Sequence, residues 1–141
     1  MPRLVALDMP GGPEFVAQLE RAWDAGDAVL PIDPRLSPSA KRRIVETMQP
    51  AVIVTPDGET ALTAARPTEP GDALVMATSG TTGDPKGVVL THAAVTASAA
   101  ATNSRLGVGT SDSWWANLPV AHVGGMSVIT RCLVAGIRCE V

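Results

Sequence analysis

The sequence TSGTTGDPKG, residues Thr78 to Gly87, is the most specialised stretch of this chain, with three glycines, four hydroxyl side chains and one lysine. Apolar segments at 73–77 and 88–90 flank it, which predicts a loop held between two strands. Glycine lets the backbone turn tightly and bring its amide hydrogens close to anionic oxygens. The hydroxyl groups add donors and Lys86 adds a positive charge, so the stretch predicts a polyphosphate-binding loop.

Two other kinds of loop share part of this composition. Flexible linkers are often rich in Gly, Ser and Thr, but Pro85 and Lys86 between hydrophobic strands favour an ordered loop. A Walker A loop requires Gly, four residues and then Gly-Lys-Ser or Gly-Lys-Thr. Here Gly83 is followed by Asp84 and Pro85, and Lys86 is followed by Gly87. The stretch is therefore a phosphate loop of another kind.

Helical and strand patterns alternate along the rest of the chain. Residues typical of helix ends bound the first two helices, with Pro13 and Gly26 around the first and Ser37 before the second. The predicted helices are 13–25, 38–49, 93–106 and 123–135, and the predicted strands are 28–32, 51–55, 73–77, 88–90, 113–120 and 137–141. Such spacing predicts an α/β fold, a layered parallel sheet of βαβ units with flanking helices. The alanine-rich helix 93–106 is expected to lie close against a sheet.

Composition argues against several classes of protein. The chain is 45% hydrophobic and 18% charged, and its net charge of −3 gives no electrostatic reason to expect a nucleic-acid partner. No apolar run approaches the roughly 20 residues that span a bilayer, and no signal-peptide pattern opens the chain, which predicts a soluble, cytoplasmic protein. The basic run 41–43 predicts a solvated helix face. Cys132 and Cys139 lack the spacing of a metal site, so they are expected to be buried thiols, with no metal bound.

The loop sequence resembles the phosphate-loop signature of the adenylate-forming superfamily, which includes acyl-CoA synthetases, aryl-CoA ligases, luciferases and nonribosomal-peptide adenylation domains. Three further segments are similar to that family: VVLTH at 88–92, VLPIDPRL at 29–36 and LPVAHVGG at 118–125. The stretch 118–136 looks most like the o-succinylbenzoate-CoA ligases of menaquinone biosynthesis. The resemblance covers roughly residues 22–141. It implies that residues 1–141 are part of the large N-terminal domain and that the small C-terminal domain is absent.

The resemblance also implies a reaction. Members of the family use ATP to activate a carboxylic acid as an acyl-adenylate, and the CoA ligases then pass the acyl group to the thiol of coenzyme A. The implied cofactors are ATP, Mg²⁺ and coenzyme A, and the implied partner is a small carboxylic acid. With Lys86 as the catalytic cation, the implied nucleotide-binding residues are Thr78, Ser79, Gly80, Thr81, Thr82, Gly83 and Lys86. The implied acyl pocket is bordered by His122, Gly124, Gly125 and Met126.

Several single residues also have purely structural interpretations. Asp33 beside a proline is typical of a turn, more than of a catalytic carboxylate. His92 is expected just before a helix, as a polar residue at its start. His122 alone indicates a hydrogen-bonded core histidine, and the resemblance makes it a pocket residue. Arg131 falls in an apolar helix and needs a partner or an exposed edge, because an isolated buried charge is costly.

Two functions stay open. The chain has no tyrosine, and its lysines are Lys41 and Lys86. The family's later motifs for adenine, magnesium and ribose, and its C-terminal catalytic lysine, are therefore absent. The first function is part of an acyl-CoA or aryl-CoA ligase that is inactive by itself; an end at Val141 inside an apolar strand favours it. The alternative is a stand-alone nucleotide- or polyphosphate-binding module without catalysis. A homo-oligomer stays open in either case.

Overall fold

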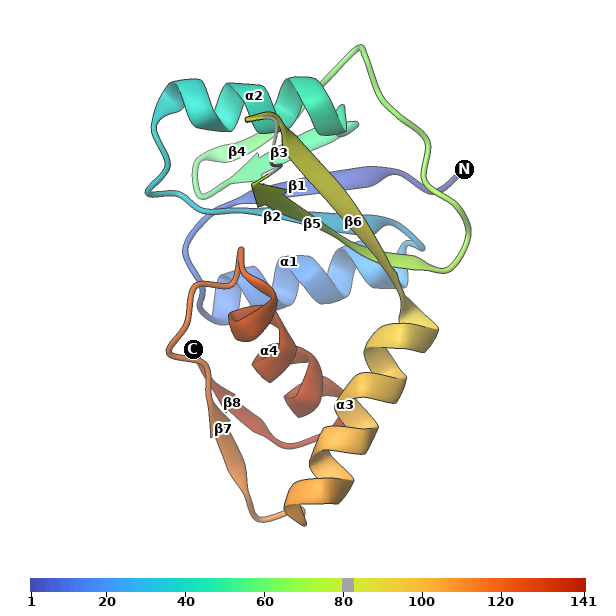
Figure 1. Ribbon diagram of the computed structural model, residues 1–141, viewed down its shortest axis with the longest axis vertical. Coiled ribbons are helices and arrows are strands. Elements are labelled where there is room, and N and C mark those ends of the chain that lie inside the picture. The colour runs from blue at the N-terminus through green and yellow to red at the C-terminus, as the bar shows by residue number, and fades with distance from the viewer. Residues whose placement is uncertain (80–82) are drawn as a thin grey trace.

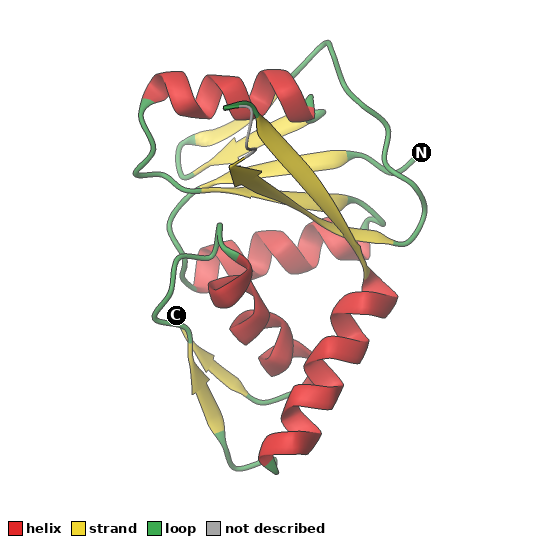
Figure 2. Cartoon of the chain, in the orientation of Figure 1, coloured by secondary structure: helices red, strands yellow, loops and turns green. Residues whose placement is uncertain are grey.

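A computed structural model describes residues 1–79 and 83–141 of the chain. Its elements are β1 (Leu4–Asp8), α1 (Pro13–Asp24), β2 (Ala28–Ile32), α2 (Pro38–Met48), β3 (Val52–Thr55), β4 (Gly58–Ala61), β5 (Asp72–Ser79), β6 (Pro85–Thr91), α3 (His92–Leu106), β7 (Ser113–Trp115), α4 (Val123–Ala135) and β8 (Arg138–Glu140). Helices and strands alternate along this order except from β3 to β6, where four strands follow one another. Figure 2 shows the helices and strands of the chain by colour. The predicted mixed α/β class is confirmed.

The main sheet has the strand order β4-β3-β1-β2-β5-β6. Its inner strands β3, β1, β2 and β5 are parallel, and β4 and β6 pair antiparallel with their neighbours at the two edges. β1 pairs with β2 from Leu4 opposite Ala28 to Asp8 opposite Ile32. Both strands are almost entirely apolar and buried, as expected for central parallel strands that are covered on both faces.

Two apolar clusters lie on the two faces of this sheet, so that the molecule is layered (Figure 1). On one face, α2 packs Met48 against strand residues such as Leu30. On the other face, α1 and α4 pack Phe15 and Ile129 against strand residues such as Leu7. Successive side chains of a strand point to opposite faces, which is why each inner strand serves both clusters. Burying a side chain such as Phe15, which is 0% exposed, contributes about 1.5–3 kcal/mol.

A second, two-stranded sheet lies beyond α4, where β7 pairs in parallel with β8. α3 leaves the end of β6 and packs alongside α4, away from most of the main sheet (Figure 1). Only Ala99 and Asn103 of α3 are buried, and the Asn103 amide donates a hydrogen bond to the carbonyl oxygen of Arg131 at 3.0 Å. The small side chains of α3 therefore allow close approach to a helix, whereas the sequence predicted approach to a sheet.

Hydroxyl side chains and glycines cap the helix ends, and Ser37 does so as predicted. The hydroxyl groups of Ser37 and Thr91 accept hydrogen bonds from backbone amides in the first turns of α2 and α3, at 3.3 and 3.2 Å. Gly107 and Gly136 end α3 and α4 in the left-handed conformation, with φ of 65° and 64°. α3 begins at His92, one residue before the predicted start at Ala93, because Thr91 takes the capping position.

The strands differ from the sequence prediction in three places. β1 and β4 were not predicted, and the strand predicted over 113–120 ends at Trp115. The prediction is wrong beyond that residue because Ala116 and Val120 turn into the core, where they are 7% and 3% exposed. Pro119 between them has no amide hydrogen to give to a strand ladder.

The two cysteines are free thiols, as predicted, with Cys132 buried and Cys139 half-buried. The Cys132 thiol donates to the carbonyl oxygen of Arg138 at 3.7 Å. Burial raises the pKa of Cys132 to about 12, and its contact with Cys139 acts in the same direction. Cys132 is therefore protonated and unreactive at neutral pH.

Candidate functional site

The predicted phosphate loop joins the two arms of an antiparallel hairpin, β5 and β6. Across this hairpin Thr78 pairs with Lys86, and Ser79 pairs with Pro85. The Thr78 hydroxyl donates a hydrogen bond to the carbonyl oxygen of Lys86 at 3.2 Å. The strand pairing therefore continues into the predicted loop and sets the lysine directly opposite a hydroxyl side chain.

The ligand-binding residues predicted in this loop fall into two groups. Thr78, Ser79, Gly83 and Lys86 are described and exposed, while the predictions for residues 80–82 lie outside the described residues. Gly83 has a φ of 87°, a left-handed conformation that favours glycine. Lys86 also borders a hollow of about 560 Å³ between the hairpin and α2. The described polar groups of the loop are thus accessible to a ligand.

The hairpin lies at a sheet edge that suits a ligand. β1, β2 and β5 are parallel, so their carboxyl ends meet at one edge of the sheet. β1 ends there at Asp8, β2 is followed there by Asp33, and β5 ends there at Ser79. Ligands of open α/β sheets bind outside the carboxyl ends of the strands. The predicted phosphate loop therefore occupies the usual binding edge.

α2 contacts both the loop and this edge. The Arg43 guanidinium donates hydrogen bonds to the carbonyl oxygen of Gly83 at 2.5 Å and to the carboxylate of Asp84 at 2.8 Å. The Lys41 ammonium donates to both carboxylate oxygens of Asp8, at 2.7 and 2.9 Å. The predicted solvated basic face is wrong for Lys41, whose side chain is only 25% exposed because it reaches the end of β1. No sequence pattern indicated the contact of Arg43 with the loop.

His122 is the residue before α4, at its N-terminal cap position. Its side chain makes no capping hydrogen bond and is exposed, while its backbone amide donates to the carbonyl oxygen of Pro119 at 3.0 Å. The interpretation of His122 as a core histidine is wrong, because the segment before α4 leaves it at the surface. An exposed imidazole at a helix start remains available to a ligand.

The first turn of α4 holds the other predicted pocket residues. Gly124 is half-buried, and Gly125 and Met126 are buried. A methyl group on Gly125 would collide with the carbonyl oxygens of Leu118 and Pro119. The sequence predicted that glycine here lets a ligand approach; in the structure Gly125 lets the preceding backbone segment pack against α4.

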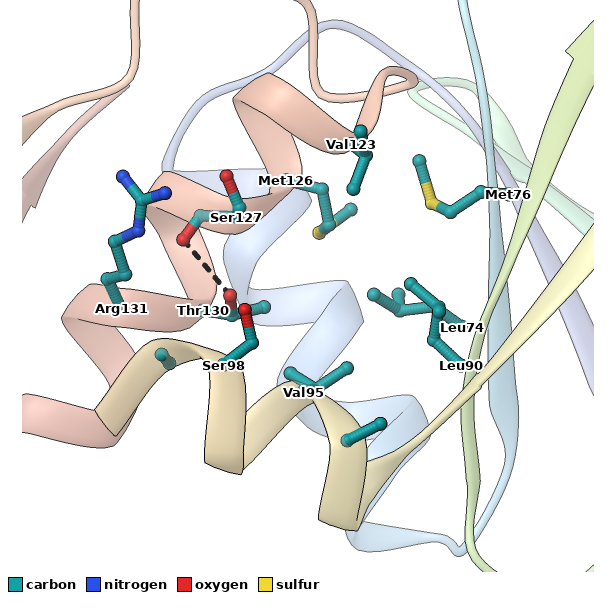
Figure 3. Close-up of a pocket in the computed structure, with 12 residues that line it drawn as sticks. Leu74, Met76, Leu90, Val95, Ser98, Val123, Met126, Ser127, Thr130 and Arg131 are labelled. Atoms are coloured by element: carbon teal, nitrogen blue, oxygen red, sulfur yellow. Dashed lines mark hydrogen bonds between the residues drawn. The ribbon is translucent and has the colours of Figure 1, made fainter. Parts of the chain in front are cut away.

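A cavity of about 180 Å³ lies between the hairpin, α3 and α4 (Figure 3). Met126 lines it, and His122, Gly124 and Gly125 do not. The sequence did not predict the other lining residues, which are Leu74, Met76, Leu90, Ala94, Val95, Ser98, Ala99, Val123, Ser127, Thr130 and Arg131. Helical spacing from Val123 through Met126 and Ser127 to Thr130 and Arg131 is the signal that could have found the α4 side.

Arg131 stands at one side of this cavity, and its guanidinium lies 5.2 Å from the centre of the Trp114 ring. This cation–π contact and partial exposure satisfy the requirement for a partner or an exposed edge. In Figure 3 the Arg131 side chain lies on the Ser127 side of α4, away from Met76 and Leu74. The cavity thus has an apolar interior and a cation at its edge.

A second hollow, of about 360 Å³, brings the end of β2 next to the segment before α4. Asp33 lies here and accepts hydrogen bonds from the Arg35 guanidinium at 3.0 and 2.7 Å and from the Arg35 amide at 2.9 Å. These bonds lower the pKa of Asp33 to about 2, and the charge of His122 adds to the effect. The interpretation of Asp33 as a turn residue agrees with the bond to its own chain two residues on.

Other kinds of site and segment find no support in the part of the chain that the structure describes. Within residues 1–79 and 83–141, no three His, Cys, Asp or Glu side chains gather as a metal site would require. Among the same residues, no helix combines the length and the apolar character needed to cross a membrane. The candidate site therefore consists of the hairpin, the start of α4, the cavity of about 180 Å³ and the two hollows of about 560 and 360 Å³.

Comparison of the sequence with models of known protein families identifies a matching family. The model of the AMP-binding enzyme family matches residues 60–141, which is more than half of the chain. The chain belongs to the AMP-binding enzyme family. The matched part of the chain includes β5, β6, α3 and α4, the elements that form the hairpin and the cavity.

Curated relatives of this chain are named ligases. A probable 2-succinylbenzoate–CoA ligase of Mycobacterium tuberculosis is 41% identical over 116 residues, which are 79% of this chain and 28% of the relative. A 2-succinylbenzoate–CoA ligase of Bacillus cytotoxicus is 44% identical over 64 residues, or 45% of this chain and 13% of the relative. The chain thus spans less than a third of the length of these relatives.

Solved structures of similar proteins share the fold of this chain. Wild-type E. coli MenE with a bound analogue of OSB-AMS has a TM-score of 0.81 and 25% identity, over 99% of this chain and 34% of its own. The o-succinylbenzoate coenzyme A synthetase (MenE) of Bacillus subtilis, in complex with ATP and magnesium ion, has a TM-score of 0.82 and 20% identity, over 99% of this chain and 44% of its own. Nearly the whole chain has the fold of these synthetases.

Proposed function

We propose that this chain supplies the phosphate-binding part of an AMP-forming acid–CoA ligase that acts on 2-succinylbenzoate or a closely related carboxylate. In the proposed reaction the carboxylate attacks the α-phosphorus of ATP, which releases pyrophosphate and forms an acyl-adenylate. The thiol of coenzyme A then attacks the acyl carbon and releases AMP. Family membership supports the adenylate chemistry, and the names of the curated relatives support the acid.

The observation that carries the proposal is the position of Lys86 opposite Thr78, in a hairpin at the carboxyl end of β5. Displacement at phosphorus depends on positioning and on stabilising the charge of the phosphate oxygens. The hairpin offers an ammonium group, hydroxyl groups and backbone amides for both purposes. The proposed ligands of the β- and γ-phosphates are Thr78, Ser79, Gly80, Thr81, Thr82, Gly83 and Lys86. Lys86 would neutralise charge on the departing pyrophosphate.

The acid is assigned to the start of α4 and the cavity beside it. The cavity interior is apolar and suits an aromatic ring, and its volume of about 180 Å³ is below the roughly 300 Å³ at which pockets for whole ligands begin. We therefore assign only the ring to this cavity, next to Met126. Arg131 at its edge is suited to a carboxylate, and 2-succinylbenzoate carries a second carboxylate that does not react. His122, Gly124 and Gly125 are proposed to border the reacting end.

ATP, Mg²⁺ and coenzyme A are the cofactors of the proposed reaction. The exposed donors of the hairpin fit an anionic polyphosphate. Mg²⁺ commonly binds through substrate phosphates and few protein ligands, so in the proposed reaction it would enter with ATP. The free thiols fit a reducing compartment, so we propose the cytoplasm. We also assign residues 1–141 to the large N-terminal domain of the ligase, as the resemblance of their motifs implies.

The test uses the protein expressed from the whole reading frame that contains these 141 residues. We expect exchange of labelled pyrophosphate into ATP that depends on 2-succinylbenzoate, and formation of the CoA thioester when coenzyme A is added. ATP binding without exchange, with every carboxylate of a panel of aromatic and aliphatic acids, would overturn the proposal. It would support a nucleotide-binding module without catalysis instead.

A further inference from the structure

Arg43 of α2 holds the part of the phosphate loop that leads into β6. Its Nη2 atom donates to the carbonyl oxygen of Gly83 at 2.5 Å and to a carboxylate oxygen of Asp84 at 2.8 Å. Pro85 follows as the first residue of β6, and Lys86 comes next. The guanidinium therefore contacts the backbone and a side chain only two or three residues before the lysine.

α2 is itself fixed to the sheet on both sides of Arg43. Before it, Lys41 binds both carboxylate oxygens of Asp8, and these two side chains are 25% and 18% exposed. After it, buried Met48 packs so closely beneath Gly87 that a methyl group on this glycine would come within 2.7 Å of the Met48 sulfur. A contact from Arg43 therefore ties the loop to a rigid part of the molecule.

The ion pair between Arg43 and Asp84 also changes the charge that the phosphate loop presents to a ligand. The Asp84 side chain is 76% exposed and lies two residues from Lys86, beside the proposed position of a triphosphate. A carboxylate there repels phosphate oxygens and competes for the lysine. Pairing with Arg43 neutralises Asp84, and the second hydrogen bond, to the Gly83 carbonyl, fixes the direction of the backbone.

We propose that Arg43 is a positioning residue for ATP, which orients the Gly83–Asp84 backbone ahead of Lys86 and keeps the Asp84 carboxylate away from the polyphosphate. This inference rests on the proposed function. It assigns Arg43 no contact with the reacting atoms, and it uses only residues outside 80–82. An ion pair as exposed as this one contributes little to the stability of the fold. If Arg43 served only to stabilise the fold, its replacement would therefore leave ATP binding almost unchanged.

The chain offers a matched control for Arg43. Arg42 is its neighbour on α2, is exposed, and has no ion-pair partner among the described residues. We expect Arg43→Gln to raise the KM for ATP roughly tenfold, with kcat and the KM for the acid changed less than about threefold. Arg42→Gln should leave all three constants near those of the unaltered protein. Arg43→Lys should recover part of the loss, since it restores the charge but not the planar guanidinium whose Nη2 atom donates both hydrogen bonds.

A second variant separates the electrostatic part from general damage. Adding Asp84→Asn to Arg43→Gln should lower the KM for ATP again, because the freed carboxylate is no longer present. Equal effects of Arg42→Gln and Arg43→Gln, or an equal rise in the KM for the acid, would overturn the proposal. So would a double variant no better than Arg43→Gln alone.

A measurement without catalysis keeps this inference distinct from the proposed function. Amide hydrogen exchange of the peptide covering 83–91 should be faster in Arg43→Gln than in Arg42→Gln. This result does not depend on whether the unaltered protein catalyses the exchange of pyrophosphate into ATP. ATP affinity by calorimetry should fall in the same variant. Absence of pyrophosphate exchange in the unaltered protein would refute the proposed function, whereas unchanged amide exchange and ATP affinity in Arg43→Gln would refute the role of Arg43.

Discussion

Thr78 and Lys86 lie directly opposite each other across the hairpin, and the Thr78 hydroxyl donates a hydrogen bond to the Lys86 carbonyl oxygen at 3.2 Å. This pairing fixes the backbone of the lysine relative to β5. The ammonium group therefore extends from the base of the phosphate loop, where strand pairing is continuous. Because the backbone of Lys86 is already fixed, its ammonium group loses little conformational entropy when it aligns with a phosphate.

We predict that Lys86→Ala lowers acid-dependent pyrophosphate exchange by about 10²–10³-fold, the usual effect of removing one group that stabilises transition-state charge. The measurement is the exchange rate at saturating ATP and acid. Lys86→Arg keeps the charge and should retain more activity than the alanine variant. Undiminished exchange in Lys86→Ala would remove this residue from the site.

Arg131→Met should raise the KM for the acid about tenfold or more, while the KM for ATP stays nearly constant. The physical reason is loss of a charged partner for the carboxylate, beside a cavity whose apolar lining is unchanged. Initial-rate kinetics with each substrate varied in turn provide the measurement. Arg105→Met, at the exposed end of α3, is the matched control, and equal effects of the two changes would contradict this assignment.

Gly125→Ala should lower the free energy of unfolding by about 1–3 kcal/mol, because the new methyl group meets two backbone carbonyl oxygens that cannot easily move. Urea unfolding gives the measurement. Gly109→Ala is a suitable control, since its methyl group would meet only Asp112 Oδ2, at 3.7 Å. Equal unfolding midpoints for the two variants would show that the segment before α4 adapts freely.

Asp33 should make stability depend on pH in the acid range. The Arg35 hydrogen bonds lower the pKa of Asp33 from 3.8 to about 2 in the folded protein. Its contribution is therefore present above the unfolded value, near pH 4, and is lost as pH falls toward 2. Arg35→Leu should shift acid unfolding to higher pH. An Asp33 carboxyl carbon that titrates near its ordinary pKa in the unaltered protein, followed by NMR, would refute this.

Cys132 should resist alkylation by iodoacetamide at pH 8 in the folded protein, because burial raises its pKa to about 12 and keeps it as the thiol. Half-buried Cys139 is the internal comparison, and mass spectrometry of peptides distinguishes the two sites. Denaturant should make them react at similar rates. Rapid labelling of Cys132 in the native state would mean that α4 and β8 separate readily.

Local sequence signals predicted the helices well, because their ends depend on nearby residues. Pro13, Ser37, Gly107 and Gly136 act through the backbone within one turn, and the helices end close to these residues. The two strands on either side of the phosphate loop were also predicted, but their antiparallel pairing and their extension into the loop were not. In each case the decisive interaction lies within a few residues of the chain.

Features that depend on distant contacts were not predictable. β1 is a short apolar run whose pairing with β2 and β3 no local pattern shows, and β4 is an exposed edge strand without apolar alternation. The strand predicted to reach Val120 ends early because two of its residues pack into the core. Arg43 contacts Asp84, 41 positions later, so the composition of α2 alone indicated only a solvated face.

The position of β1 has a consequence for biosynthesis. β1 pairs on one side with β2 and on the other with β3, both of which follow it along the chain. On the ribosome it is made before either partner, so this apolar run must wait until two later segments have emerged. Nascent chains that end before β3 leave one side of β1 open, and these are the species that we expect holdase chaperones to bind.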